Sequence, residues 1–156
     1  TFANGNVYIG ELRNGQITGT GKLYYPTGER YEGQFLNAQK TGKGTYYYKN
    51  GNIYEGYFVA DRKEGFGKLT LASGDQYTGE FKDNSRTGKG VYVWANGDKY
   101  EGEFVNGQMH GFGTFTWADG EKYTGNWTFN IREGQGTLVS KDGSQQMLVF
   151  ENGKLQ

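Results

Sequence analysis

His110 is the first residue to consider for chemistry, because it is the only histidine in a chain that has no cysteine. A catalytic or metal-binding histidine needs partners at a defined spacing, such as a nucleophile, a carboxylate or further ligands. No such set accompanies His110. The same position of an internal repeat, described below, holds Thr18, Thr41, Glu64, Thr87 and Glu133. His110 is therefore interpreted as an ordinary repeat-position residue, and no catalytic residue, metal or cofactor is expected.

Six Gly-x-Gly pairs raise a second form of chemistry, the binding of phosphate by backbone amides. Phosphate loops of this kind open a helix and are followed by Lys-Ser or Lys-Thr. Here the pairs lie in strand-like sequence with neither feature, so a phosphate loop is rejected. Lys+Arg and Asp+Glu both number 17, and this balance argues against nucleic acid as a partner. No apolar run reaches the length of about 18 residues that spans a membrane.

The elements that would position any functional side chain come from a 23-residue repeat. A tyrosine begins each unit, a glycine follows two residues later, and a large apolar residue follows four residues after the tyrosine. The tyrosines are Tyr8, Tyr31, Tyr54, Tyr77, Tyr100 and Tyr123, and the apolar residues are Leu12, Phe35, Phe58, Phe81, Phe104 and Trp127. A Gly-x-Gly pair and a closing glycine complete every unit. This regularity predicts an array of identical structural modules.

Each module is predicted to be a β-hairpin. In the fifth unit, Tyr100 to Val105 and Gly111 to Trp117 alternate with period 2, and Asn106-Gly107 and Asp119-Gly120 are turn dipeptides. Short turns force antiparallel pairing of consecutive strands, which gives a meander of about thirteen strands. We therefore expect an all-β fold, an elongated single-sheet solenoid of hairpins with the form of a twisted, trough-like rod. A propeller is the rejected rival, since six units would give only about three blades.

The whole chain, residues 1–156, is predicted to be one repeat array. Residues 1–7 correspond to the end of a preceding partial repeat, and residues 146–156 to a C-terminal half-repeat or cap. The six full repeats between them cover residues 8–30, 31–53, 54–76, 77–99, 100–122 and 123–145.

One sheet face is predicted to carry aromatic rings over bare glycine backbone, because the tyrosine, glycine and apolar positions share a face. The opposite face carries glutamates that are expected to oppose lysines. Ten rings are assigned a structural role in lining the trough: Tyr31, Phe35, Tyr54, Phe58, Tyr77, Phe81, Tyr100, Phe104, Tyr123 and Trp127. The outermost bulky residues of the second strands are instead predicted to bind a partner, and these are Tyr25, Tyr48, Leu71, Trp94 and Trp117.

The pattern Tyr-x-Gly-x-Phe, Asn-Gly, Gly-x-Gly, Asp-Gly at 23 residues resembles the MORN repeat (membrane occupation and recognition nexus). Tyr100-Glu101-Gly102-Glu103-Phe104 is close to the family pattern, whereas Ala38, Asp61, Asn84 and Asn130 replace its turn glycine. The resemblance implies an elongated array of hairpins that acts as a non-catalytic scaffold. It also favours a location in the cytoplasm, at the cytoskeleton or at a membrane surface.

The leading functional prediction is therefore a protein-interaction module that receives a partner helix or extended peptide in its aromatic trough. Two alternatives stay open. Anionic phospholipid headgroups could bind Arg62, Lys63, Lys82, Arg86 and Lys89, and carbohydrate could stack on exposed rings. A homodimer through the C-terminal end, residues 146–156, is compatible with each of them.

Overall fold

The protein contains fourteen strands and no helix in a computed structural model that describes residues 1–156. Every strand is antiparallel to its neighbour, and the strand order in the sheet is the order along the chain. The predicted all-β array of hairpins is thus confirmed. The strands are β1 (Val7–Arg13), β2 (Gln16–Tyr24), β3 (Arg30–Leu36), β4 (Gln39–Tyr47), β5 (Ile53–Val59), β6 (Arg62–Thr70), β7 (Gln76–Lys82), β8 (Ser85–Val93), β9 (Lys99–Val105), β10 (Gln108–Thr116), β11 (Lys122–Thr128), β12 (Ile131–Val139), β13 (Gln145–Glu151) and β14 (Lys154–Leu155).

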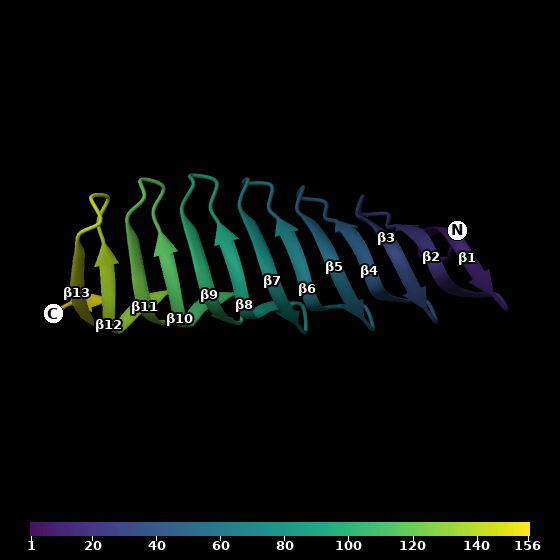
Figure 1. Cartoon of the computed structure of the whole chain (residues 1–156). Coiled ribbons are helices and arrows are strands. Elements are labelled where there is room, and N and C mark those ends of the chain that lie inside the picture. Colours follow the sequence, from purple (N-terminus) through teal and green to yellow (C-terminus); the bar gives the residue numbers. More distant parts are fainter. The chain divides into compact units, whose positions relative to one another are not determined.

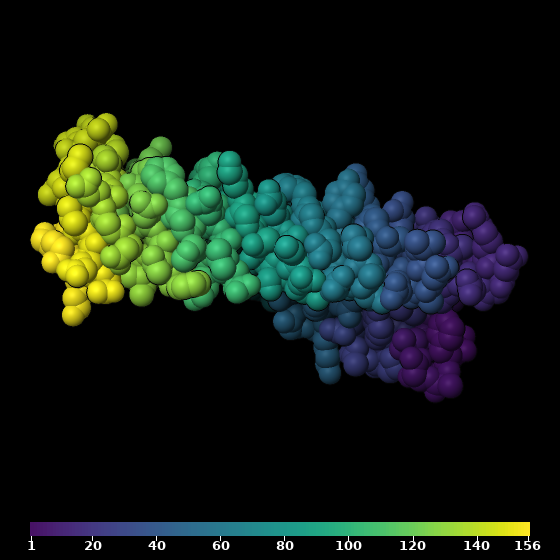
Figure 2. Space-filling model, turned by 90° about the horizontal axis from the view of Figure 1, so that it is seen from below, coloured from purple at the N-terminus to yellow at the C-terminus, as the bar shows by residue number.

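The chain forms two compact units, and each is described by itself. The N-terminal unit comprises Thr1–Ser73 and Phe81–Asn84, and the C-terminal unit comprises Gly74–Glu80 and Ser85–Gln156. In both units Figure 1 shows the same arrangement, with tight turns at one end of the strands and longer connections at the other. Within each unit the colours of Figure 2 follow one another in sequence order, because every hairpin packs on the next one along the chain. The expected elongated and twisted form of the whole array stays a prediction.

The tight turns are two-residue loops whose backbone suits the twist of a hairpin. Val105 pairs with Gln108, and both intervening residues have positive φ, 47° at Asn106 and 79° at Gly107. Such turns match the right-handed twist of the flanking strands. Where the turn glycine is replaced, the substitute also has positive φ, as in Asp61 at 68° and Asn130 at 70°. The departures from the repeat pattern therefore leave the turn geometry intact.

The substituted turn residues link each repeat to the one before it. The Oδ1 atom of Asp61 accepts a hydrogen bond from the Lys40 amide at 2.8 Å, and Asn130 accepts one from the Met109 amide at 2.8 Å. Asn84 does the same for the Lys63 amide at 2.9 Å. Each of these amides lies in the preceding hairpin, so neighbouring repeats satisfy each other's polar groups.

The core is a ladder of rings that meet edge to face, a geometry that aromatic pairs prefer. Tyr100 packs on Phe104 with ring centroids 5.2 Å apart and on Trp127 at 5.6 Å, while Tyr77 packs on Phe104 at 5.1 Å. Each tyrosine thus bridges two repeats. All ten rings that were assigned a structural role are buried, with at most 6% of any residue exposed: Tyr31, Phe35, Tyr54, Phe58, Tyr77, Phe81, Tyr100, Phe104, Tyr123 and Trp127.

Glycine is required beneath each tyrosine because the ring lies directly on the backbone. A Cβ atom at Gly113 would lie 2.5 Å from Cζ of Tyr100 and 2.6 Å from its Cε2. The Tyr100 hydroxyl donates to the Glu103 carbonyl at 3.0 Å. The corresponding hydroxyls of Tyr8, Tyr31, Tyr54 and Tyr77 make the same bond, at 2.8–2.9 Å. Ring, glycine pair and hydroxyl together fix the first strand of a repeat against the second.

Tyr123 departs from this pattern, because its hydroxyl is buried without a hydrogen-bond partner. We therefore expect Tyr123→Phe to leave the free energy of unfolding unchanged or to raise it by about 1 kcal/mol, since an unsatisfied polar group is removed. Tyr100→Phe should lower it by about 1–2 kcal/mol, since the Glu103 carbonyl loses its donor. Chemical denaturation of the two variants measures the contrast. An equal loss in both would contradict the assignment of the two hydroxyls.

The two glycines of each Gly-x-Gly pair differ in backbone conformation, although their period-2 spacing predicts that both lie under a ring. Gly111 has φ of 70°, and the pairing register shifts between Met109 and Gly113. This is a β-bulge, and it frees the Phe112 amide from the strand ladder. The Glu103 carboxylate accepts a hydrogen bond from that amide at 2.7 Å. Glu103 also lies opposite Lys89 on the neighbouring strand β8, as expected, so the same glutamate faces a lysine and caps a bulge.

Candidate functional site

A second row of aromatic side chains runs beside the buried ladder, and it is named here the outer ring row. In the C-terminal unit it consists of Tyr92, Trp94, Phe115 and Trp117. Their rings follow one another with centroid distances of 4.5 Å, 5.2 Å and 5.0 Å. All four are half-buried. Each ring therefore rests on its neighbours while part of its surface stays open to solvent.

The N-terminal unit has its own section of the outer ring row, formed by Tyr25, Tyr46 and Tyr48. Tyr46 lies 6.0 Å from Tyr25 and 4.6 Å from Tyr48 between ring centroids. Its hydroxyl donates to Oε2 of Glu29 at 3.1 Å. Burial, together with the charge of Tyr25, raises the pKa of Tyr46 above its ordinary value. This section is built on hydroxyl-bearing rings, whereas the C-terminal section relies on tryptophan.

Long cationic side chains lie between the two rows of rings, and sequence reasoning missed their common role. Lys40, Lys63, Arg86 and Arg132 occupy the ninth position after the repeat tyrosine. Lys63 donates from Nζ to the Tyr48 hydroxyl at 2.9 Å and lies 5.5 Å from the Tyr54 centroid. The Arg86 guanidinium lies 5.3 Å from the Tyr92 centroid. Cation–π attraction and hydrogen bonds hold these charges at the edge of the rings. Aligning the repeats by position would have exposed this column.

A depression of about 220 Å³ opens in the C-terminal unit where the outer ring row meets this cationic column. Its lining includes Tyr92 and Trp94 of the row together with Arg86 and Met109. The Asp75 carboxylate accepts a hydrogen bond from the Tyr92 hydroxyl at 2.7 Å. Burial, together with that carboxylate, raises the pKa of Tyr92 to about 12. The depression therefore combines a rigid apolar wall with a polar edge.

The five predicted partner-binding residues lie at equivalent places, each as the first residue after a strand. In Trp94 the backbone amide donates to the Asp98 carbonyl and the carbonyl accepts from Gly97, both at 2.9 Å, so the residue begins the longer connection. None of the five is fully exposed: Tyr25, Tyr48, Leu71, Trp94 and Trp117 are all half-buried. The more exposed aromatic residues, Tyr57, Phe66 and Phe112, belong to other positions of the repeat. The expected strip of open apolar surface is thus partly covered by its own neighbours.

The cations that were considered for phospholipid binding have separate surroundings. Arg62 forms an ion pair with Asp83 at 3.1 Å. Lys63 and Arg86 contact rings, as described above, while Lys89 is exposed. Lys82 is exposed as well, so the five cations divide into one ion-paired residue, two that contact rings and two on the open surface.

His110 has the environment of a structural residue. Its Nδ1 accepts a hydrogen bond from the Phe129 amide at 3.4 Å, and the two rings lie 4.6 Å apart. Glu64 and Glu133, which hold the same repeat position, accept the Asp83 and Asn152 amides at 3.0 Å and 2.9 Å. The histidine therefore performs the turn-capping role of its counterparts. No group of three or more potential metal-binding side chains is present, and no helix could cross a membrane.

Hairpins of fixed length, a ladder of rings over glycine pairs and links between successive turns define a β-hairpin repeat protein. The MORN repeat pattern matches residues 8–30, 31–53, 54–76, 77–99, 100–122 and 123–145. The chain belongs to the MORN repeat family. A search of curated proteins found no match.

Two solved structures are similar to this chain at low sequence identity. The SAS-4 TCP domain of Drosophila melanogaster, in complex with a proline-rich motif of Ana2, is 15% identical, with 85% of this chain and 87% of that chain covered and a TM-score of 0.49. The TCP10 domain of Danio rerio CPAP, in complex with a STIL peptide, is 15% identical, with 90% and 68% covered and a TM-score of 0.39. Likeness at this level carries no inference about the function of this chain.

Proposed function

We propose that the chain is a non-catalytic protein-interaction module that binds a helix or extended peptide along the outer ring row. The observation that carries the proposal is the unbroken stack of half-buried rings in the C-terminal unit, Tyr92, Trp94, Phe115 and Trp117, beside the depression at Arg86. Partially open tryptophan and tyrosine rings are the residues that most often dominate binding energy at protein interfaces. Their exposed surface is available to the apolar side chains of a partner.

The packing of the row favours binding because its side chains are already ordered. Trp94 is held between Tyr92 and Phe115, and Trp117 rests on Phe115. A partner that covers these rings therefore loses little side-chain entropy on the protein's side, since immobilising free side chains is one of the main costs of association. Arg86 at the edge of the row provides donors for carbonyl or carboxylate groups of the partner. The row thus offers apolar anchors with a polar rim.

The test uses peptides selected from a displayed random library against the intact chain, with dissociation constants measured by calorimetry. The double variant Trp94→Ala, Trp117→Ala is expected to weaken a selected peptide about 100-fold, since anchors of this kind each contribute about 2 kcal/mol or more. The matched control is Val93→Ala, Thr116→Ala, which changes the residues immediately preceding each tryptophan. The control should bind like the wild type. Undiminished affinity in the tryptophan variant, with its β circular dichroism preserved, would refute the proposal.

Phospholipid and carbohydrate are tested with the same proteins. Flotation with phosphoinositide vesicles and binding to glycan arrays provide the two readouts. Strong binding to either, unaffected by peptide and combined with a failed peptide selection, would replace the proposal with that alternative.

A further inference from the structure

The residue between the two glycines of a Gly-x-Gly pair has a backbone amide that can be compared between repeats. In several repeats a side chain accepts a hydrogen bond from this amide. The Thr20 amide donates to Oε1 of Glu11 at 2.9 Å, and the Phe112 amide donates to Oε2 of Glu103 at 2.7 Å. In the second repeat the Lys43 amide donates to the side-chain oxygen of Gln34 at 3.2 Å. The capping residue always stands three positions after the repeat tyrosine. A side-chain oxygen thus caps this amide in the first, second and fifth repeats.

The third repeat, residues 54–76, lacks this oxygen because Tyr57 occupies the capping position. The Phe66 amide corresponds to the capped amides of Thr20 and Phe112. The pairing register also shifts at the same place in this repeat, between Gly56 and Phe58. The space is also open. A Cβ atom built on Gly65 would meet only Cβ of Tyr57, at 3.8 Å, whereas at Gly111 it would meet the Glu103 carboxylate. The bulge amide of this repeat and room for a carboxylate thus coincide.

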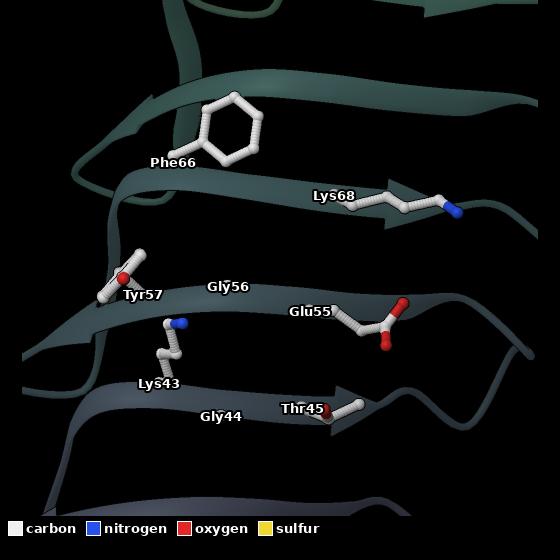
Figure 3. A pocket seen from close by; sticks show the side chains of 8 residues that line it. All are labelled: Lys43, Gly44, Thr45, Glu55, Gly56, Tyr57, Phe66 and Lys68. Atoms are coloured by element: carbon white, nitrogen blue, oxygen red, sulfur yellow. The ribbon is translucent and has the colours of Figure 1, made fainter.

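A pocket of about 520 Å³ surrounds this donor on β4, β5 and β6 of the N-terminal unit. Tyr57 and Phe66 line one end of it and are 42% and 59% exposed. Figure 3 shows Lys43 reaching toward Tyr57 at that end, and its Nζ lies 5.6 Å from the Tyr57 centroid. The pocket therefore combines a cation, two apolar rings and the residue whose amide is capped in sibling repeats.

The charges of the pocket are unevenly placed. Glu55 and Lys68 are cross-strand partners, and Figure 3 shows both directed toward the end away from Tyr57 and Phe66. Lys43 is the charged group beside the rings. A single negative charge is therefore favoured at the aromatic end, while the Glu55 carboxylate disfavours a more highly charged anion such as phosphate.

We propose that this pocket binds a glutamate or aspartate side chain from an extended, apolar-flanked segment of a partner protein. The partner's carboxylate accepts the Phe66 amide, as Glu103 accepts the Phe112 amide in its own repeat. Lys43 adds a charge-assisted contact, and Tyr57 and Phe66 cover the apolar residues that flank the acid. Phe66 lies between Gly65 and Gly67, and Gly67 faces the Tyr54 ring. The pocket is therefore on the sheet face opposite the outer ring row, and it is independent of the proposed function.

The test follows the Phe66 amide directly by ¹H–¹⁵N correlation NMR of the intact chain. The probes are acetyl-Leu-Glu-Leu-amide, its glutamine counterpart, sodium acetate and inorganic phosphate. The glutamate peptide should shift the Phe66 amide downfield in a saturable manner and bind at least about tenfold more tightly than the glutamine peptide, as expected for a hydrogen bond to a charged acceptor. An unmoved Phe66 amide, or equal binding of both peptides, overturns the proposal. Binding of acetate or phosphate as tight as that of the peptide overturns the assignment to a partner segment.

Tyr57→Glu provides the decisive variant, because it installs the cap that the sibling repeats have. The internal carboxylate should occupy the Phe66 amide and weaken the glutamate peptide at least about tenfold. Asn126→Glu is the matched control, since it places a carboxylate at the same repeat position in a hairpin outside the pocket, and it should bind like the wild type. If Tyr57→Glu fails to fold, Tyr57→Gln replaces it, because Gln34 caps the second repeat in this way. Unchanged binding in the folded capped variant contradicts the proposal. The Trp94→Ala, Trp117→Ala variant should bind this peptide normally, which separates the two sites.

Discussion

Alanine in place of Gly113 is expected to destabilise the C-terminal unit by about 3–5 kcal/mol, which is the cost of losing a buried aromatic contact. The added Cβ would lie 2.5 Å from Cζ of Tyr100. The two strands are in close contact here, because a Cβ on Gly102 would likewise lie only 2.5 Å from the Gly113 Cα. The Tyr100 ring must therefore leave its place, and its contacts with Phe104 and Trp127 are lost with it.

A double-mutant cycle tests the cause of this loss. Tyr100→Ala alone should also cost about 3–5 kcal/mol, but adding Gly113→Ala to it should cost less than about 1 kcal/mol, because the clash has disappeared. Denaturation followed by tryptophan fluorescence is suited to the measurement, since Trp94, Trp117 and Trp127 all belong to the C-terminal unit. Additive losses would show that Gly113 is needed for another reason, such as backbone conformation.

Alkaline pH is expected to unfold the chain between about pH 10 and pH 12. Burial raises the pKa of Tyr77 to about 12 and, with the charge of Glu103, raises that of Tyr100 to about 12, from an ordinary value of 10.0. Burial also raises the pKa values of Tyr31 and Tyr54. The unfolded chain therefore releases these hydroxyl protons at a lower pH than the folded chain does. The free energy of unfolding keeps its full value below pH 10 and falls as the pH rises toward the folded-state pKa values. Each tyrosine whose pKa is raised by two units accounts for a loss of about 2–3 kcal/mol.

Circular dichroism and tyrosinate absorbance recorded against pH check this expectation. The two signals should change together, because the buried hydroxyls ionise when the sheet opens. Tyr100→Phe provides the control: it is less stable than the wild type at neutral pH, and the difference should shrink above pH 10, since the variant has one proton fewer to release. Ionisation of Tyr77 and Tyr100 near pH 10 in an intact sheet would be incompatible with the burial described here.

The strands and the ring ladder were predictable because one physical pattern is repeated. Tyr100, Gly102 and Phe104 alternate along a strand, and the same alternation recurs in every unit. Six occurrences of one spacing cannot be due to chance, so the strand prediction does not depend on a single repeat. Burial of the tyrosine rings over glycine followed from the same spacing, and the structure shows Tyr100 fully buried above Gly113.

The bulge and its cap were not predictable from spacing alone. Gly111 and Gly113 are the same residue type two positions apart, yet only Gly111 has positive φ, and only Gly113 lies under a ring. Period-2 reasoning places both on one face because it assumes an unbroken ladder. A signal was nevertheless present, since Glu or Gln stands at the capping position of four repeats and Tyr57 breaks that series.

The cationic column was missed for a related reason. Lys63 and Arg86 were considered for phospholipid binding, but their long apolar stems let them lie along the rings. Their charged ends reach the Tyr48 hydroxyl and the Tyr92 face. Residue type alone predicts that such charged side chains lie in solvent. The position in the repeat, between two aromatic rows, determines the actual environment.

The links formed by Asp61, Asn84 and Asn130 have a consequence for how such a chain can evolve. Each residue completes the backbone of the hairpin before it, always across 21 positions of sequence. Duplication or loss of one whole repeat in the gene leaves a chain in which every remaining turn again meets an amide of the correct kind. Insertions of any other length sever that correspondence. Such a chain can therefore gain or lose modules in steps of one, whereas the links fix the register within them.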